Sequence, residues 1–123
     1  MTIDTNIIIA YLSGDENVVN FLNSWRNKGG FLYLPTIVET ELLSFTGWTE
    51  KEEALVKIFL QENFISIPFD HNLAEIASQL RKKNKIKLPD AAIAATAIYT
   101  KSPLVTRNIK DFKNINNLNL IDI

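Results

Sequence analysis

The chain has 123 residues, of which 46% are hydrophobic and 22% are charged, and its formal net charge is −1. This length fits a single domain, residues 1–123, and the apolar fraction is too high for an intrinsically disordered chain. The absence of cysteine excludes disulfides, thiolate zinc sites and cysteine nucleophiles, and the single histidine, His71, argues against a histidine-rich metal site. No apolar run is long enough to cross a membrane and no basic signal segment opens the chain, so we expect a cytoplasmic protein without a membrane partner.

Short apolar strands alternate with amphipathic helices along the chain. Over the first half we expect a strand at Met1–Ile3, helices at Ile7–Leu12 and from Asp15 to about Asn27, a strand at Phe31–Leu34, and helices from Pro35 and from Thr49 to about Glu62. Over the second half we expect a strand at Phe64–Pro68, helices from Asp70 to about Lys83 and at Ala91–Tyr99, and strands at Leu104–Thr106 and Leu120–Ile123. This alternation is typical of a three-layer α/β/α sandwich with a central, mostly parallel sheet.

Two aspartates stand where predicted helices begin. Asp4 directly follows the first strand, and Asp90 precedes the alanine-rich segment 91–97, which is apolar on nearly all sides and is therefore expected to be buried. Because ligands of open parallel sheets bind at the carboxyl ends of the strands, Asp4 lies at the expected edge of a site. Helix N-capping is the alternative interpretation of each aspartate.

Glu41 falls inside the apolar sector of its helix, which is formed by Ile37, Val38, Leu42 and Phe45. Glu39 falls outside that sector and is expected to be an ordinary solvated glutamate. Burying a carboxylate is strongly unfavourable unless it is paired or bound to a metal, so the pattern indicates a function for Glu41. A salt-bridged glutamate at the rim of the sector is the alternative.

The segment after the strand at 104–106 is also polar, with Asn108 and Asp111 following Thr106 and Arg107. Turn formation would explain these residues in isolation. Taken with the two helices, however, two strand ends would bring three carboxylates and one amide into one cleft, where like charges cannot all stay ionised without a cation. Oxygen ligands favour Mg²⁺ or Mn²⁺, and such an ion beside a basic surface is typical of phosphodiester hydrolysis.

The charge of the chain is strongly polarised. Residues 1–80 carry 4 basic and 11 acidic side chains, whereas residues 81–113 carry 9 basic and only 2 acidic ones. The cations nearest the proposed cleft are Arg81, Lys82, Lys83, Lys85 and Lys87 on one side and Arg107, Lys110 and Lys113 on the other. We expect these groups to bind the phosphates of a polyanion, the alternative being a solvated helix end.

Four segments carry a more specific signal: Ile3–Asn6, Thr36–Leu43, Leu88–Ala97 and Leu104–Phe112. In this order and spacing, which span the whole chain, they resemble the PIN-domain nucleases and, within them, the VapC-type toxins of bacterial toxin–antitoxin pairs. The resemblance implies a parallel sheet with helices on both faces and metal-dependent endoribonuclease activity. It also implies an RNA substrate, a homodimer and an antitoxin, whose tail we expect in an apolar groove lined by the first helices, Ile7–Trp25.

Carried over by position, the resemblance assigns the catalytic, metal-binding acids to Asp4, Glu41 and Asp90. Asn108 stands where many members have a fourth aspartate, and Asp111, one helical turn further on, is expected to compensate as a ligand. Asn6 and Thr106 match positions that orient the acids.

Two kinds of alternative stay open at this point. Because Asn108 replaces an acid, the chain could be a PIN module without catalysis that binds RNA or protein as a regulator. A haloacid-dehalogenase-like phosphatase would need a second aspartate at Asn6, and a response-regulator receiver would need an acidic pair after the first strand.

Overall fold

Five short parallel strands form one sheet in the order β3-β2-β1-β4-β5. In the computed structural model, which describes residues 1–123, the strands are β1 (Thr2–Ile3), β2 (Tyr33–Pro35), β3 (Ile65–Ile67), β4 (Leu104–Val105) and β5 (Leu120–Ile121). The sheet is therefore parallel throughout, and the predicted strands are confirmed. Four are one or two residues shorter than predicted, whereas β2 begins two residues later and includes Pro35, where a helix was expected to begin.

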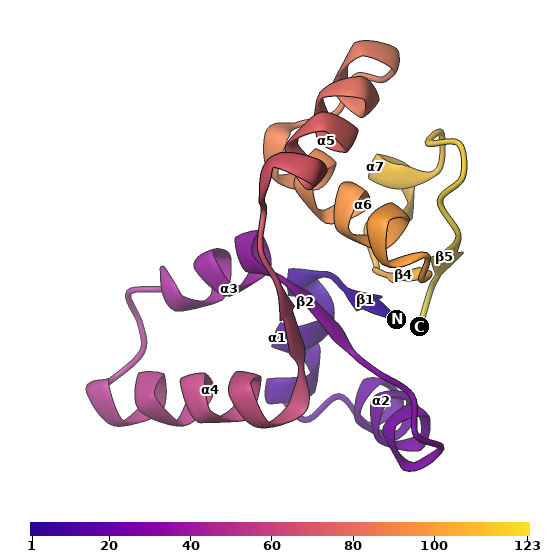
Figure 1. Ribbon diagram of the computed structural model, residues 1–123. Coiled ribbons are helices and arrows are strands. Elements are labelled where there is room, and N and C mark those ends of the chain that lie inside the picture. Colours follow the sequence, from indigo (N-terminus) through magenta and orange to yellow (C-terminus); the bar gives the residue numbers. More distant parts are fainter.

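Seven helices connect the strands. They are α1 (Thr5–Leu12), α2 (Glu16–Asn27), α3 (Thr36–Leu43), α4 (Glu50–Asn63), α5 (His71–Lys83), α6 (Leu88–Thr100) and α7 (Ile109–Phe112). Figure 1 shows α5, α6 and α7 on one side of the sheet and α1, α2 and α4 on the other. Right-handed crossovers require this division, because the chain moves across the sheet in one direction from β1 to β3 and returns in the other to β4 and β5. The predicted three-layer sandwich is confirmed.

The core lies on both faces of β1 and β4, whose Ile3, Leu104 and Val105 are fully buried. Helix α6 packs close to the sheet and to α5, since every residue from 91 to 97 is buried and its alanines contact Ala77 of α5. Small side chains permit this close approach, which fixes the start of α6 at the carboxyl edge of the sheet. In no helix does an apolar stretch reach the length needed to cross a bilayer.

Local sequence signals set most helix starts. Asp15 caps α2 by accepting a hydrogen bond from the Val18 amide, and Thr49 and Glu52 form both bonds of a capping box at α4. Gly14, at φ +81°, allows the tight turn between α1 and α2.

Two expectations about local structure were wrong. Helix α6 begins at Leu88 rather than Ala91, because Pro89 fits the first turn of a helix, and Lys87 occupies the N-cap position. Asp90 therefore lies within the first turn and is not a cap. The polar segment after β4, for which no helix was predicted, contains α7, a single turn held by the fully buried side chain of Phe112.

Candidate functional site

The site lies between two neighbouring strands from which the chain continues in opposite directions across the sheet. Strands β1 and β4 are neighbours at the centre of the sheet, but the chain leaves β1 toward β2 and leaves β4 toward β5. Loops that separate in this way open a crevice at the carboxyl ends of the two strands. Asp4 follows β1 and Thr106 follows β4, so both side chains stand at this crevice.

Asp4 is buried, with only 4% of its surface exposed, and both of its carboxylate oxygens are held. Oδ1 accepts a hydrogen bond of 2.7 Å from the Thr5 amide, which caps α1. Oδ2 accepts bonds from Asn6 Nδ2 at 3.0 Å and from Thr106 Oγ1 at 2.7 Å. The residues expected to orient the acids thus both donate to Asp4, and the capping interpretation of Asp4 is also correct.

Asn6 and Thr106 also tie the first turn of α1 to the loop after β4. The hydroxyl of Thr106, which is fully buried, accepts a hydrogen bond of 3.0 Å from the Asn108 amide. Asn6 Oδ1 accepts one of 3.1 Å from the Arg107 amide. The two side chains therefore connect the backbone of residues 107 and 108 to the carboxylate of Asp4.

Glu41 is exposed, so the expectation that it lies on a core-facing stripe was wrong. Phe45, which belongs to the same predicted sector, lies beyond the end of α3 at Leu43 and is 58% exposed, and Glu39 is only partly exposed. Val38 and Leu42 of the predicted sector are buried in the core, whereas Glu41 and Phe45 line an open groove. Glu41 is nevertheless placed near Asp4, since its Oε1 accepts a hydrogen bond of 2.8 Å from the hydroxyl of Thr5.

The groove beside Glu41 has a volume of about 800 Å³ and a largely apolar lining. Its apolar residues are Ile9, Leu12, Leu42, Phe45, Trp48, Leu55 and Val56. They come from α1, α3, α4 and the loop between α3 and α4. The expectation of a groove formed by the first helices up to Trp25 is therefore correct for α1 and wrong for α2, which contributes no residue to it.

Asp90 is the residue whose pKa is affected by the other acidic side chains. It is half-buried in the first turn of α6, and its pKa is raised, first by burial and then by the negative charges of Asp111, Asp4 and Glu41. Lys87 opposes this shift and lowers the pKa. As the side chains are oriented, no three acids or histidines converge closely enough to hold a metal ion.

Asn108 and Asp111 lie at opposite ends of the same short turn, and both are exposed. Asn108 occupies the N-cap position of α7, but its side chain makes no capping bond. Asp111 is near enough to Asp90 for its charge to raise the pKa of that residue. A fourth carboxylate is thus present at the cleft, although it is Asp111 and not residue 108 that supplies it.

Beside Asp90 and Asp111 is a polar pocket of about 470 Å³. Its lining includes Lys83, Lys85, Lys87 and Lys110, together with Asn84 and Asn114. Of the other expected cations, Arg81 borders an adjoining hollow that shares four lining residues with the pocket, Lys82 lines neither of them, and Arg107 is paired with Asp15. The basic segment therefore contributes to the cleft with only some of its side chains.

Sequence reasoning missed Thr5 and Asp15 as members of this arrangement. A hydroxyl directly after the strand-end Asp4 was the available signal for Thr5. Asp15 was taken only as the cap of α2, and its second oxygen was left without a partner.

The fold is an α/β domain with a parallel sheet. At the carboxyl ends of its central strands it has an acidic cleft, and lysines line the pocket beside that cleft. A model of the PIN domain matches residues 1–118. The chain belongs to the PIN-domain family.

Two kinds of relatives extend this likeness. The chain is 32% identical over 133 aligned residues to Ribonuclease VapC1 of Rickettsia felis, and the match covers 100% of this chain and 96% of the relative. It is similar to the solved structure of VapBC2 from Rickettsia felis bound to a DNA fragment from their promoter, with a TM-score of 0.86, 28% identity and coverage of 99% and 97%. It is also similar to a toxin–antitoxin complex from Klebsiella pneumoniae, with a TM-score of 0.80, 30% identity and coverage of 98% and 94%.

Proposed function

We propose that this chain is a metal-dependent endoribonuclease that hydrolyses RNA phosphodiester bonds, and that it is the toxin of a VapBC-type toxin–antitoxin pair. The observation that carries the proposal is the gathering of carboxylates at the carboxyl edge of the sheet. Asp4 is held there by three hydrogen bonds, Glu41 is bound to Thr5 at the start of α1, and Asp90 and Asp111 lie close enough to act on one another. Relatives named as a VapC ribonuclease and as toxin–antitoxin complexes support the same function.

The chemistry of the donor set fits a hard divalent cation. The acidic groups offer only oxygen, their mutual repulsion disfavours full ionisation, and Asp4 is already oriented by three hydrogen bonds. Asp4, Glu41 and Asp90 would hold Mg²⁺ or Mn²⁺, with Asn108 or Asp111 as further ligands. When bound, such an ion activates a water molecule and stabilises the leaving oxygen of a phosphodiester.

The lysine-lined pocket is the proposed path of the RNA. Lys83, Lys85, Lys87 and Lys110 surround a volume that reaches Asp90 and Asp111, so phosphates bound there would lie next to the acids. Contacts of this kind release counterions, and binding should therefore weaken as salt is added. Among the expected RNA-binding residues, Arg81 and Lys82 precede Lys83 on α5 and do not line the pocket, so we assign them a smaller contribution to RNA binding.

The apolar groove is the proposed seat of the antitoxin. A chain segment lying against Phe45 and Leu12 would run past Glu41, which also lines the groove. An apolar helix or tail in such a groove is a common mode of peptide recognition. Occupation of the groove would thereby block access to Glu41, one of the proposed catalytic acids. We also expect the toxin to be a homodimer when it binds the antitoxin.

The alternative of a PIN module without catalysis was motivated by Asn108. The structure gives a reason to prefer the enzyme, because Asp111 places a further negative charge close enough to act on Asp90.

The test compares carboxylates on neighbouring positions of one helix. Glu41→Gln is expected to reduce RNA cleavage to background, as are Asp4→Asn and Asp90→Asn. Glu39→Gln on the same helix is the matched control and is expected to keep activity close to wild type. Cleavage of a pool of short RNAs of random sequence, with added Mn²⁺, measures both. Equal activity in the Glu41 and Glu39 variants would refute the assignment.

A further inference from the structure

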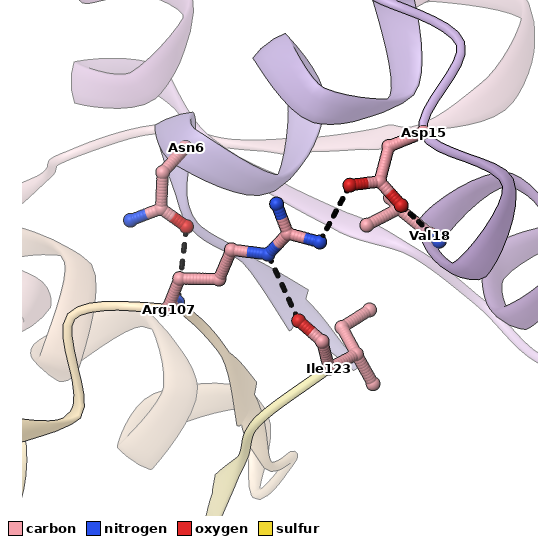
Figure 2. A network of polar contacts seen from close by, with 5 residues as sticks. All are labelled: Asn6, Asp15, Val18, Arg107 and Ile123. Carbon is pink, nitrogen blue, oxygen red and sulfur yellow. Dashed lines mark hydrogen bonds and ion pairs between the residues drawn. The ribbon is translucent and has the colours of Figure 1, made fainter.

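The side chain of Arg107 is anchored at two places outside the cleft. Its Nη2 donates a hydrogen bond of 2.8 Å to Asp15 Oδ2, and its Nε donates one of 2.8 Å to the main-chain oxygen of Ile123. Figure 2 shows the side chain extending from the loop after β4 toward these two partners. Arg107 therefore joins the start of α2 and the segment after β5 to the loop that follows Thr106.

The main chain of Arg107 makes a second connection, to the acidic site. Its amide donates a hydrogen bond of 3.1 Å to Asn6 Oδ1, and Asn6 Nδ2 donates one of 3.0 Å to Asp4 Oδ2. The same asparagine side chain thus binds the backbone of residue 107 with its oxygen and orients the carboxylate of Asp4 with its nitrogen. Any shift of the loop at Arg107 would be passed to Asp4 through one planar amide.

We propose that Arg107 is a positioning residue. Its anchorage to Asp15 and Ile123 fixes the loop after β4 and, through Asn6, the orientation of Asp4. The proposal rests on the proposed ribonuclease function, because it assigns Arg107 a role in the rate of that reaction. It replaces the expectation from the sequence that Arg107 binds RNA phosphates.

The surroundings of Arg107 favour positioning over phosphate binding. The guanidinium charge is already paired with a carboxylate, and the same interaction is the first cause of the lowered pKa of Asp15. Arg107 is not among the residues that line the lysine pocket. The two side chains are 38% and 31% exposed, and ion pairs this accessible contribute little to folding stability. Variants of the pair should therefore fold, which leaves placement of the loop as the measurable effect.

The Asp15→Asn variant separates the two roles by the sign of its effect. Asparagine caps a helix as well as aspartate does, so α2 is preserved, but the charge that holds the guanidinium is lost. If Arg107 positions the loop, kcat falls by about tenfold, as is usual when a supporting hydrogen bond is removed, while KM is unchanged. If Arg107 binds phosphate, freeing it from Asp15 instead tightens RNA binding and overturns the proposal.

Further variants of the pair test the same idea. Arg107→Gln and Arg107→Lys are both expected to lower kcat, because lysine retains the charge but cannot make both bonds. The double variant of Asp15 and Arg107 should be no worse than the Arg107 variant alone, since Arg107→Gln already removes the bond to Asp15 together with the one to Ile123. The dependence of RNA binding on salt should not change. Arg26→Gln is the matched control, because Arg26 is an exposed arginine of α2 that takes part in neither of the two ion pairs of the chain. A flatter salt dependence in Arg107→Gln would overturn the proposal.

A readout without RNA keeps this proposal separate from the proposed function. The side-chain amide signals of Asn6 in nitrogen-15 NMR spectra should shift in Asp15→Asn and Arg107→Gln and stay in place in Arg26→Gln. Unmoved Asn6 signals in both variants would overturn the proposal whatever the activity. A protein that cuts no RNA but shows these shifts would refute the ribonuclease and support the coupling of Arg107 to Asn6.

Discussion

Adding a divalent cation is expected to stabilise this protein by an amount that can be worked out in advance. Burial and the charges of Asp111, Asp4 and Glu41 disfavour the ionised form of Asp90, and a cation among them would reverse that effect. An ion that binds only the folded state at about 100 times its Kd adds about 2.7 kcal/mol to the free energy of unfolding. With an unfolding entropy of about 2.1 cal/mol/K per residue, a chain of 123 residues should melt about 10 °C higher.

Thermal unfolding of protein freed of metal by a chelator, followed while Mn²⁺ is added, measures this shift. Potassium chloride at matched ionic strength separates ion binding from general screening. Asp4→Asn and Asp90→Asn should lose most of the shift, whereas Glu39→Gln should keep it. Because each variant is compared with itself before and after the addition, a change in its starting stability does not affect the reading. A melting temperature that stays constant with millimolar Mn²⁺, or that rises equally in Asp4→Asn, would refute the metal site.

Three further predictions follow from the same surfaces. In the presence of a chelator, Asp90→Asn should gain stability relative to the wild type as pH rises. The pKa of Asp90 is raised in the folded state, so the stability that its protonated form contributes is complete below the ordinary aspartate pKa and is lost as pH passes through the folded-state pKa. Denaturant titrations at several pH values test this, and a stability difference independent of pH would contradict it. Lys85→Gln should lower the slope of RNA affinity against salt by about 0.7, the value for one phosphate of a single strand, whereas Lys82→Gln should leave it nearly unchanged, and equal slopes in filter-binding titrations would argue against the pocket. Phe45→Glu should abolish co-purification with an antitoxin encoded beside the toxin gene and leave RNA cleavage intact, and retained co-purification would place the partner elsewhere.

The parts of the site that the sequence located are those determined by local geometry. A carboxylate directly after a buried strand must stand at the edge of a parallel sheet, and Asp4 does. The alanine-rich helix had to be buried, so Asp90 at its start had to face the same edge. These inferences need only the periodicity of each element and the rule that parallel strands end together.

The burial of Glu41 could not be predicted in the same way. A helical wheel states which residues share a face, but it does not state what covers that face. Here α3 ends at Leu43, so the exposed Phe45 lies outside the helix, and it lines a groove together with Glu41 and the buried Leu42. The turn α7 was missed for a related reason, because a single apolar residue, Phe112, anchors a polar segment too short to show periodicity.

The pairing of Arg107 with Asp15 could not be predicted, because the charge of a segment says nothing about distant partners. Asp15 lies 92 positions earlier in the chain, and the sequence already explained it as a helix cap. A carboxylate has two oxygens with about four acceptor positions, however, and a cap uses only one of the oxygens. Asp15 binds the Val18 amide with Oδ1 and Arg107 with Oδ2, while Asp4 caps α1 with Oδ1 and binds Asn6 and Thr106 with Oδ2.

Capping and site-building are therefore not competing interpretations of an aspartate at a helix start. The cap fixes one oxygen against the helix, and this constraint holds the other oxygen in place for a second partner. For Asp4 the second oxygen accepts two bonds, which leaves room among about four acceptor positions for a cation. For Asp15 the second oxygen holds the guanidinium that anchors the loop after β4. Two aspartates at helix starts thereby have complementary roles: Asp4 is a candidate metal ligand, and Asp15 anchors the arginine that keeps Asp4 in place.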